Sequence, residues 1–133
     1  MPDRCIVRAV LYLQSHTYSG AIMRALSVRH PYAELIARDE KHWEFRSWKT
    51  AHRGDLLIVA SVAPCPDGRA DHPEIFAPGI ELHYGAAICV VTLVGIDGEP
   101  GDYEWEIDNA RRVAPVKVRG KLNLYTAEDP LIR

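Results

Sequence analysis

The amino-acid sequence predicts an α+β domain that is mainly β, a small mixed or antiparallel β-barrel of about six strands with one or two helices. Three observations favour this class. Short segments of alternating polar and apolar side chains recur at close intervals, as in half-buried strands. Two uninterrupted apolar runs are typical of strands buried on both faces. The segments show no repeating strand–helix–strand rhythm, which argues against a doubly wound parallel sheet.

The first predicted elements are a strand, a helix and a second strand. Residues 24–29 alternate polar and apolar side chains, as in a half-buried strand. Pro31 is suited to the start of a helix, because a proline at the first helical position loses no hydrogen bond. Residues 43–48 alternate again, so Trp43 and Phe45 share one face, which we expect to be mostly core. The opposite face carries Glu44, Arg46 and Trp48.

The remaining elements surround two central strands. The two apolar runs, residues 56–60 and 86–94, predict these strands. Residues 64–79 between them are rich in proline, glycine and aspartate and predict a surface loop with at most a short helix. A turn is expected at residues 96–101, where glycine, proline and aspartate gather. Three further extended segments complete the set: residues 103–108, 111–118 and 122–125.

The size and charge of the chain indicate one globular domain without a strong electrostatic bias. Its 133 residues include 16 basic and 18 acidic side chains, for a formal net charge of −2. This balance argues against a protein that coats nucleic acid by net charge alone. Any nucleic-acid contact must come from a local basic patch or from a pocket for one nucleotide. The three scattered cysteines do not form a disulfide framework, so we expect a cytoplasmic protein.

The sequence also bears on the domain boundary, on membrane spans and on metal sites. We interpret residues 1–22 as an N-terminal extension upstream of the true start, and residues 23–133 as the domain, because strand character begins at Met23. No window approaches the roughly 20 apolar residues of a membrane span, so no membrane partner is expected. The histidine and cysteine spacings do not match a zinc site, and we expect neither a metal nor a cofactor. The oligomeric state stays open.

Several blocks of sequence, in the same order along the chain, resemble the ASCH domain family. The resemblance covers roughly residues 23–126. Its blocks are Leu26–Ala33, Lys41–Lys49, Arg53–Ile58, Gly85–Val94, Trp105–Asn109 and Pro115–Lys121. It implies a PUA-like β-barrel, related to domains that bind modified or structured RNA. A fold hosts many functions, so the function must be argued from the site.

The same resemblance raises two catalytic alternatives, and whether the chain is an enzyme stays open. Some bacterial members resemble amidohydrolases that act on N4-acetylcytidine with a lysine, a threonine three residues later and a distant glutamate. Others are described as ribonucleases. Lys41 matches the lysine, but Glu44 stands where the threonine hydroxyl is required. Lys41 and Glu44 are therefore candidates for an acid–base pair acting on a bound water, with a plain ion pair as the alternative.

The candidate binding residues centre on the face that carries Glu44, Arg46 and Trp48. A carboxylate accepts hydrogen bonds from exocyclic amines, a guanidinium grips phosphate and an indole stacks on a base. The simpler alternative is a surface Arg–Glu pair with Trp48 packed against an edge. The remaining candidates are Ser27, Arg29 and Tyr32 along the same cleft, Lys49, Arg53 and Lys121 as phosphate contacts, Trp105 as a pocket floor, and Asn109 as a reader of a base edge.

We therefore expect a binding module that takes RNA or a nucleotide-like ligand in a polar cleft. The cleft should lie between the first helix and the strand of residues 41–48. A scaffold or protein-interaction domain is the third alternative, which an exposed apolar patch would favour.

Overall fold

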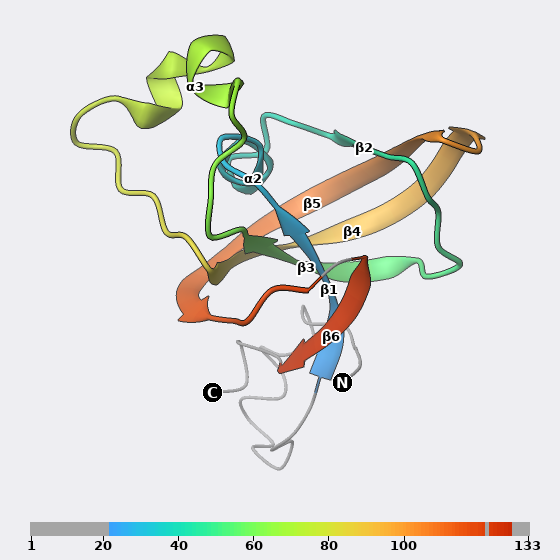
Figure 1. Cartoon of the computed structure of the whole chain (residues 1–133). Helices are drawn as coiled ribbons and strands as arrows, with labels where there is room; N and C mark the ends of the chain where they lie inside the picture. Colours follow the sequence, from blue (N-terminus) through green and yellow to red (C-terminus); the bar gives the residue numbers. More distant parts are fainter. Residues whose placement is uncertain (1–21, 122, 129–133) are drawn as a thin grey trace.

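The computed structural model describes residues 22–121 and 123–128. Of the predicted extension, only Ile22 is included, and it is the first residue of a strand. The other residues of the extension lie outside the described part. Figure 1 shows the elements in chain order, and they are β1 (Ile22–Val28), α2 (Tyr32–Ala37), β2 (Trp43–Arg46), β3 (Gly54–Ala60), α3 (Gly68–Asp71), a 3₁₀ helix η1 (Pro73–Phe76), β4 (Ala86–Glu99), β5 (Asp102–Lys117) and β6 (Leu124–Glu128).

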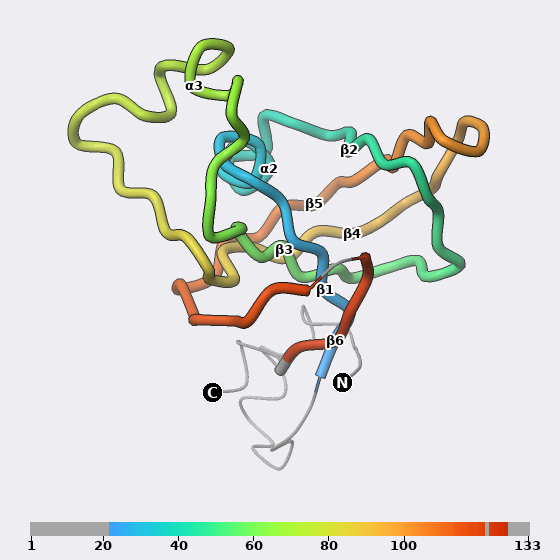
Figure 2. The backbone as a smooth tube through the Cα atoms, viewed as in Figure 1, coloured from blue at the N-terminus to red at the C-terminus, as the bar shows by residue number. Residues whose placement is uncertain are grey.

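The six strands form one mixed sheet in the order β2-β5-β4-β3-β1-β6. β1 and β3 run parallel, and the other neighbouring pairs are antiparallel. Figure 2 shows the long β4–β5 hairpin crossing the molecule beside β1 and β3. Among the described residues the two end strands, β2 and β6, do not pair, so the sheet is barrel-like but not closed. The predicted class, mainly β with about six strands and two short helices, is confirmed.

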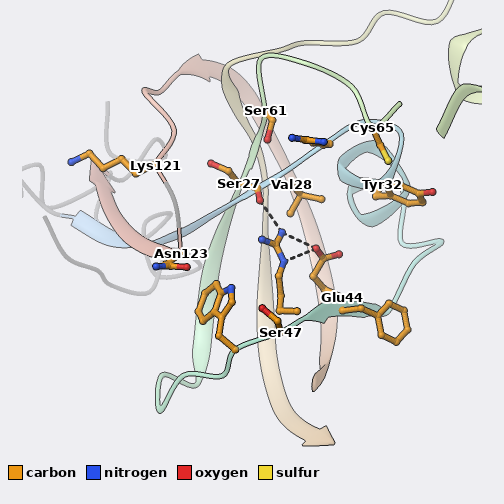
Figure 3. A pocket seen from close by; sticks show the side chains of 13 residues that line it. Ser27, Val28, Tyr32, Glu44, Ser47, Ser61, Cys65, Lys121 and Asn123 are labelled. Atoms are coloured by element: carbon orange, nitrogen blue, oxygen red, sulfur yellow. Dashed lines mark hydrogen bonds and ion pairs between the residues drawn. The ribbon is translucent and has the colours of Figure 1, made fainter. Parts of the chain in front are cut away.

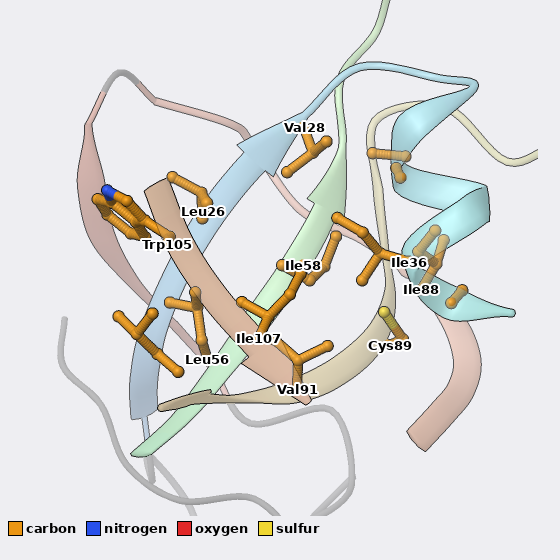
Figure 4. Close-up of a cluster of buried hydrophobic side chains, with 14 of the residues drawn as sticks. Leu26, Val28, Ile36, Leu56, Ile58, Ile88, Cys89, Val91, Trp105 and Ile107 are labelled. Carbon is orange, nitrogen blue, oxygen red and sulfur yellow. The ribbon is translucent and has the colours of Figure 1, made fainter. Parts of the chain in front are cut away.

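The curled sheet encloses a core to which its strands contribute alternate side chains. Leu26 of β1 and Trp105 of β5 belong to the same buried cluster although their strands are not neighbours, so the sheet must curve around it (Figure 4). Ile36 of α2 covers one end of this cluster. Cys89 is a small core residue, as predicted, and burial raises the pKa of its thiol to about 12.

A second buried cluster occupies the other face of the same strands. Leu57 and Val59 belong to it, whereas Leu56 and Ile58 belong to the first cluster. Successive side chains of a strand point to opposite faces, so a strand apolar on both must be buried on both. The prediction of two central strands from the unbroken apolar runs is therefore confirmed.

Two predictions about the strands are wrong. Trp43 and Phe45 are not core residues, because their side chains are 39% and 59% exposed on the edge strand β2. The inward face of β2 carries Glu44 instead, which is buried. The predicted turn at residues 96–101 is also shorter than expected, because β4 continues to Glu99. Gly98 is needed there, since its φ is +114° and an added Cβ would lie 2.3 Å from the Asp102 carbonyl oxygen.

A buried carboxylate attaches α2 to the sheet. Glu34 is buried on this helix and accepts hydrogen bonds from Arg112 of β5, at 2.8 and 3.2 Å, and from Arg38 at 3.0 Å. Burial alone would raise the pKa of Glu34, but the two guanidinium groups outweigh it and hold the pKa below its ordinary value. Because α2 has only six residues, this two-arginine clamp supplies stability that its own backbone cannot.

We predict that the free energy of unfolding falls as the pH drops below about 6.5, the ordinary pKa of histidine. His30 is fully buried, and its Nε2 donates to the His83 carbonyl oxygen at 2.8 Å. Burial lowers the pKa of His30. Just below the ordinary histidine pKa, His30 is therefore protonated in the unfolded chain but still neutral in the folded chain. The slope from one such group approaches about 1.4 kcal/mol per pH unit.

The measurement is urea unfolding of the wild type and of His30→Gln between pH 7.5 and 5. Glutamine retains a donor for the His83 carbonyl but does not titrate. The slope should be smaller in the variant, although His52 adds a contribution of the same sign because its burial also lowers its pKa. Equal slopes in the two proteins would show that His30 does not carry the effect.

Candidate functional site

A polar pocket of about 540 Å³ opens where β1 ends, α2 begins and β2 passes. Its walls also include the loop after β3 and the segment before β6. Figure 3 shows these side chains around the pocket, with Glu44 facing Ser27 near its centre. The lining residues are Ser27, Val28, Arg29, Tyr32, Glu44, Phe45, Arg46, Ser47, Trp48, Ser61, Cys65, Lys121 and Asn123.

The centre of the pocket is an ordered network between β2 and β1. Arg46 donates from Nε to Glu44 Oε2 at 2.9 Å, and from Nη2 to the Ser27 carbonyl oxygen at 2.9 Å. Lys41 donates to the other carboxylate oxygen, Glu44 Oε1, at 3.0 Å, and also to the Trp43 carbonyl. Glu44 is buried and contacts two cations, Lys41 and Arg46, so opposite charges surround this carboxylate.

The uncommitted polar groups of the pocket are mostly cationic. Arg29 and Lys121 are exposed at the rim and form no ion pair with any residue that the structure describes. The Nη1 group of Arg46 has no hydrogen-bond partner in the same described ranges, and its side chain is 23% exposed. The Ser61 hydroxyl lies in the lining as well. A lining with three cations and one carboxylate that is already ion-paired favours an anionic or strongly polar ligand.

Aromatic side chains give the pocket apolar surfaces. Trp48 packs edge-on against Trp105 with ring centroids 4.9 Å apart, and Trp105 Nε1 donates to the Trp48 carbonyl oxygen at 3.1 Å. The core therefore holds the half-buried Trp48 in place. Phe45 lies at the rim and is the most exposed aromatic side chain in the lining, at 59%. Such rings suit a flat aromatic ligand, because stacking requires a rigid and accessible face.

The structure brings seven of the predicted site residues together in this lining: Ser27, Arg29, Tyr32, Glu44, Arg46, Trp48 and Lys121. Lys41 lies outside the lining but contacts Glu44 directly. These positions agree with the predicted cleft between the first helix and residues 41–48.

Besides Lys41, four predicted site residues lie outside the lining of the pocket. The Lys49 ammonium lies 5.7 Å from the centroid of the Tyr103 ring, and Arg53 donates to backbone carbonyls of its own turn, those of Thr50 and His52. Trp105 is fully buried, so it supports Trp48 from behind instead of forming a pocket floor. Asn109 lies in β5 with a positive φ of 56°. Backbone geometry, and not base reading, accounts for an asparagine there.

Sequence reasoning missed several lining residues, among them Ser61, Cys65 and Asn123. Ser61 follows β3 directly, and its backbone N–H donates to the Val28 carbonyl oxygen at 3.0 Å. Parallel pairing of β1 with β3 brings the ends of both strands to one edge of the sheet. A predicted parallel pairing could therefore have placed Ser61 beside Ser27. Nothing local to Cys65 or Asn123 indicates a site.

One group of potential metal ligands occurs in the described ranges, outside the pocket. Asp39, His42 and Asp108 present ligand atoms within 4.8 Å of one another, but all three are exposed. Exposed acidic groups gather in this way without an ion, and no lining residue takes part. The pocket itself offers one carboxylate, already held by two cations, and one free thiol at Cys65. This donor set does not suit a metal centre.

A small, curled, mixed sheet with a polar pocket at the ends of its parallel strands defines a PUA-like, barrel-like domain. A family model for the ASCH domain matches residues 26–124, which is most of the chain, so the chain belongs to the ASCH domain family. Among curated proteins no significant match is found. In the described part of the chain, no helix is long and apolar enough to cross a membrane.

Proposed function

We propose that this ASCH domain binds RNA or a nucleotide-like ligand in the polar pocket. For RNA, one unpaired nucleotide would enter the pocket. The observation that carries the proposal is a pocket of about 540 Å³ whose lining combines three cationic side chains, Arg29, Arg46 and Lys121, with the hydrogen-bonded Glu44. This volume lies in the range typical of small-molecule sites. The local cations supply the attraction for phosphate that the net charge of −2 does not provide.

Glu44 supplies the base-reading chemistry of this proposal. Each of its carboxylate oxygens has two lone pairs; Oε2 faces both Nε and Nη2 of Arg46, whereas Oε1 accepts from Lys41 and keeps capacity for one more donor. It can therefore accept from the exocyclic amine of cytosine or adenine, or from the donor edge of guanine. Uracil lacks such an amine, so we expect the uridine nucleotide to bind more weakly than the cytidine nucleotide.

Hydrolysis is the second reading of the same residues, and the contacts of Lys41 argue against it. Lys41 donates to Glu44 and to the Trp43 carbonyl, so the candidate acid–base pair forms a plain ion pair in the structure, the simpler of the two alternatives. No hydroxyl occupies position 44. These observations therefore favour a binding role for the pocket over a catalytic role. The free thiols at Cys65 and Cys89 fit the reducing cytoplasm that we propose as the compartment.

We expect Arg29→Ala to weaken binding of cytidine 5′-monophosphate and of a short single-stranded RNA about tenfold, because it removes one charge-assisted contact. Calorimetric titration at fixed salt is the measurement. Arg53→Ala is the matched control, since it removes the same charge from a side chain that bonds its own turn. It should change affinity less than about twofold. Equal losses in the two variants would indicate general electrostatic attraction instead of the pocket.

The catalytic alternative is tested on the same protein by mass spectrometry of the products. We expect N4-acetylcytidine and a mixed-sequence RNA to be recovered unchanged, with and without a divalent metal. Turnover of either substrate that Lys41→Ala abolishes would replace the binding proposal with an enzymatic one.

A further inference from the structure

A second hollow of about 280 Å³ adjoins the polar pocket. The two share Ser27, Ser61 and Lys121 in their linings, so they are compartments of one continuous surface groove. Figure 3 shows Lys121 and Ser61 away from Glu44, and both residues also line the second hollow. The residues that line the second hollow but not the first are Ala60, Val62, Gly85 and Gly120.

Small side chains keep this second hollow open. Apart from Val62 and Lys121, every lining residue is glycine, alanine or serine. At Gly120 an added Cβ would lie 2.8 Å from Ser27 Oγ, so a larger residue would displace the hydroxyl that both compartments share. At Gly85 the φ of +64° disfavours a side chain. Val62 is 82% exposed and offers an apolar surface that no described residue covers.

Lys121 stands at the junction of the two compartments. Its ammonium group forms no ion pair or hydrogen bond with the residues that the structure describes, although it borders both hollows. The Tyr125 hydroxyl bonds Ser27 Oγ at 2.8 Å and also the backbone of Lys121, which holds this segment against β1. A cationic side chain that borders both hollows and has no partner among the described residues is placed for the phosphate that links two nucleosides.

We infer that the ligand is a single strand of at least two nucleotides and not a free mononucleotide. One nucleoside lies in the polar pocket, the linking phosphate lies against Lys121, and the neighbouring nucleoside lies in the second hollow against Val62. The smaller, more apolar compartment reads no base edge, so the neighbouring position tolerates any base. This inference rests on the proposed function and narrows its substrate class to unpaired RNA.

The test compares mononucleotides with dinucleotides on the full chain by calorimetric titration. We expect the dinucleotide CpC to bind at least about tenfold tighter than cytidine 5′-monophosphate, because stacking and one further phosphate contact are added. Val62→Asp should reduce the affinity for CpC at least about fivefold, because its carboxylate repels the strand. It should leave the affinity for the mononucleotide within twofold. Val62→Asn is the matched control, of the same size without the charge, and should retain most of the CpC affinity.

The outcomes separate this inference from the proposed function. If the mononucleotide binds and CpC binds no tighter, the second compartment is not used and the inference fails while the proposed function stands. If CpC binds tighter but Val62→Asp leaves its affinity unchanged, the second nucleotide lies elsewhere and the assignment is overturned. If neither ligand nor a longer RNA binds, the proposed function fails and the inference fails with it.

Discussion

Replacing Arg46 with alanine is expected to weaken nucleotide binding by about thirtyfold or more and to reduce the free energy of unfolding by about 1–3 kcal/mol. Arg46 acts on both quantities because it links β2 to β1 through Glu44 and the Ser27 carbonyl oxygen. Its loss removes the cation nearest the base-reading carboxylate. It also leaves the buried Glu44 with Lys41 as its remaining cationic partner in the described part of the chain.

Arg46→Lys separates the charge of this residue from its shape. A lysine keeps the positive charge but cannot make the planar set of bonds to Glu44 and Ser27 at once, so we expect an intermediate affinity. Lys49→Ala is the matched control, because Lys49 lies three residues further along the chain but outside the pocket lining. Calorimetric titration and urea unfolding measure the two effects. Wild-type affinity in a folded Arg46→Ala protein would remove Arg46 from the site.

Replacing Trp105 with alanine is expected to cost about 3–5 kcal/mol of unfolding free energy, the largest stability effect we predict. Trp105 is fully buried in the inner core, packs against Trp48 and donates to its carbonyl oxygen. Removing the indole leaves a large cavity and an unsatisfied carbonyl, and it frees Trp48 to move. Pocket affinity should therefore fall together with stability.

Two further variants show whether Trp105 supports the pocket or touches the ligand. Trp105→Phe fills most of the cavity but loses the N–H, so we expect it to recover most of the stability and most of the affinity. Trp43→Ala is the matched control. Trp43 is exposed on the edge strand, so its replacement should lower the free energy of unfolding by about 1 kcal/mol or less. If Trp105→Ala abolished binding without changing the urea unfolding midpoint, Trp105 would contact the ligand.

The fold could be predicted largely from hydrophobic patterning, and the exceptions have physical causes. The unbroken apolar runs around Leu57 and Val90 admit one explanation, a strand buried on both faces, and the structure agrees. Trp43 and Phe45 were assigned to the core because alternation gives two faces without saying which is buried. Here Lys41 and Arg46 satisfy the Glu44 carboxylate, so the polar face turns inward.

The pocket could be predicted in part. The correct candidates lie on elements that the structure brings to one place, mainly β1 and β2. Ser27, Arg46 and Trp48 follow from strand alternation and from the resemblance to a family, and they do lie in one lining. Lys49 and Arg53 lie outside it, because a long cationic side chain on the surface finds the nearest ring or carbonyl. The parallel pairing of β1 with β3 places the loop after β3 in the pocket. No local sequence pattern predicts this long-range pairing.

The most direct test of the central claim is a titration of the ¹⁵N-labelled full chain with each of the four nucleoside 5′-monophosphates, followed by amide chemical shifts. We expect saturable shifts at Arg29, Arg46 and Ser61, largest with a base that carries an exocyclic amine, and unchanged shifts at Arg53 and Asn109. The absence of saturable shifts with all four nucleotides and with a short RNA, or shifts confined to residues outside the pocket, would contradict it.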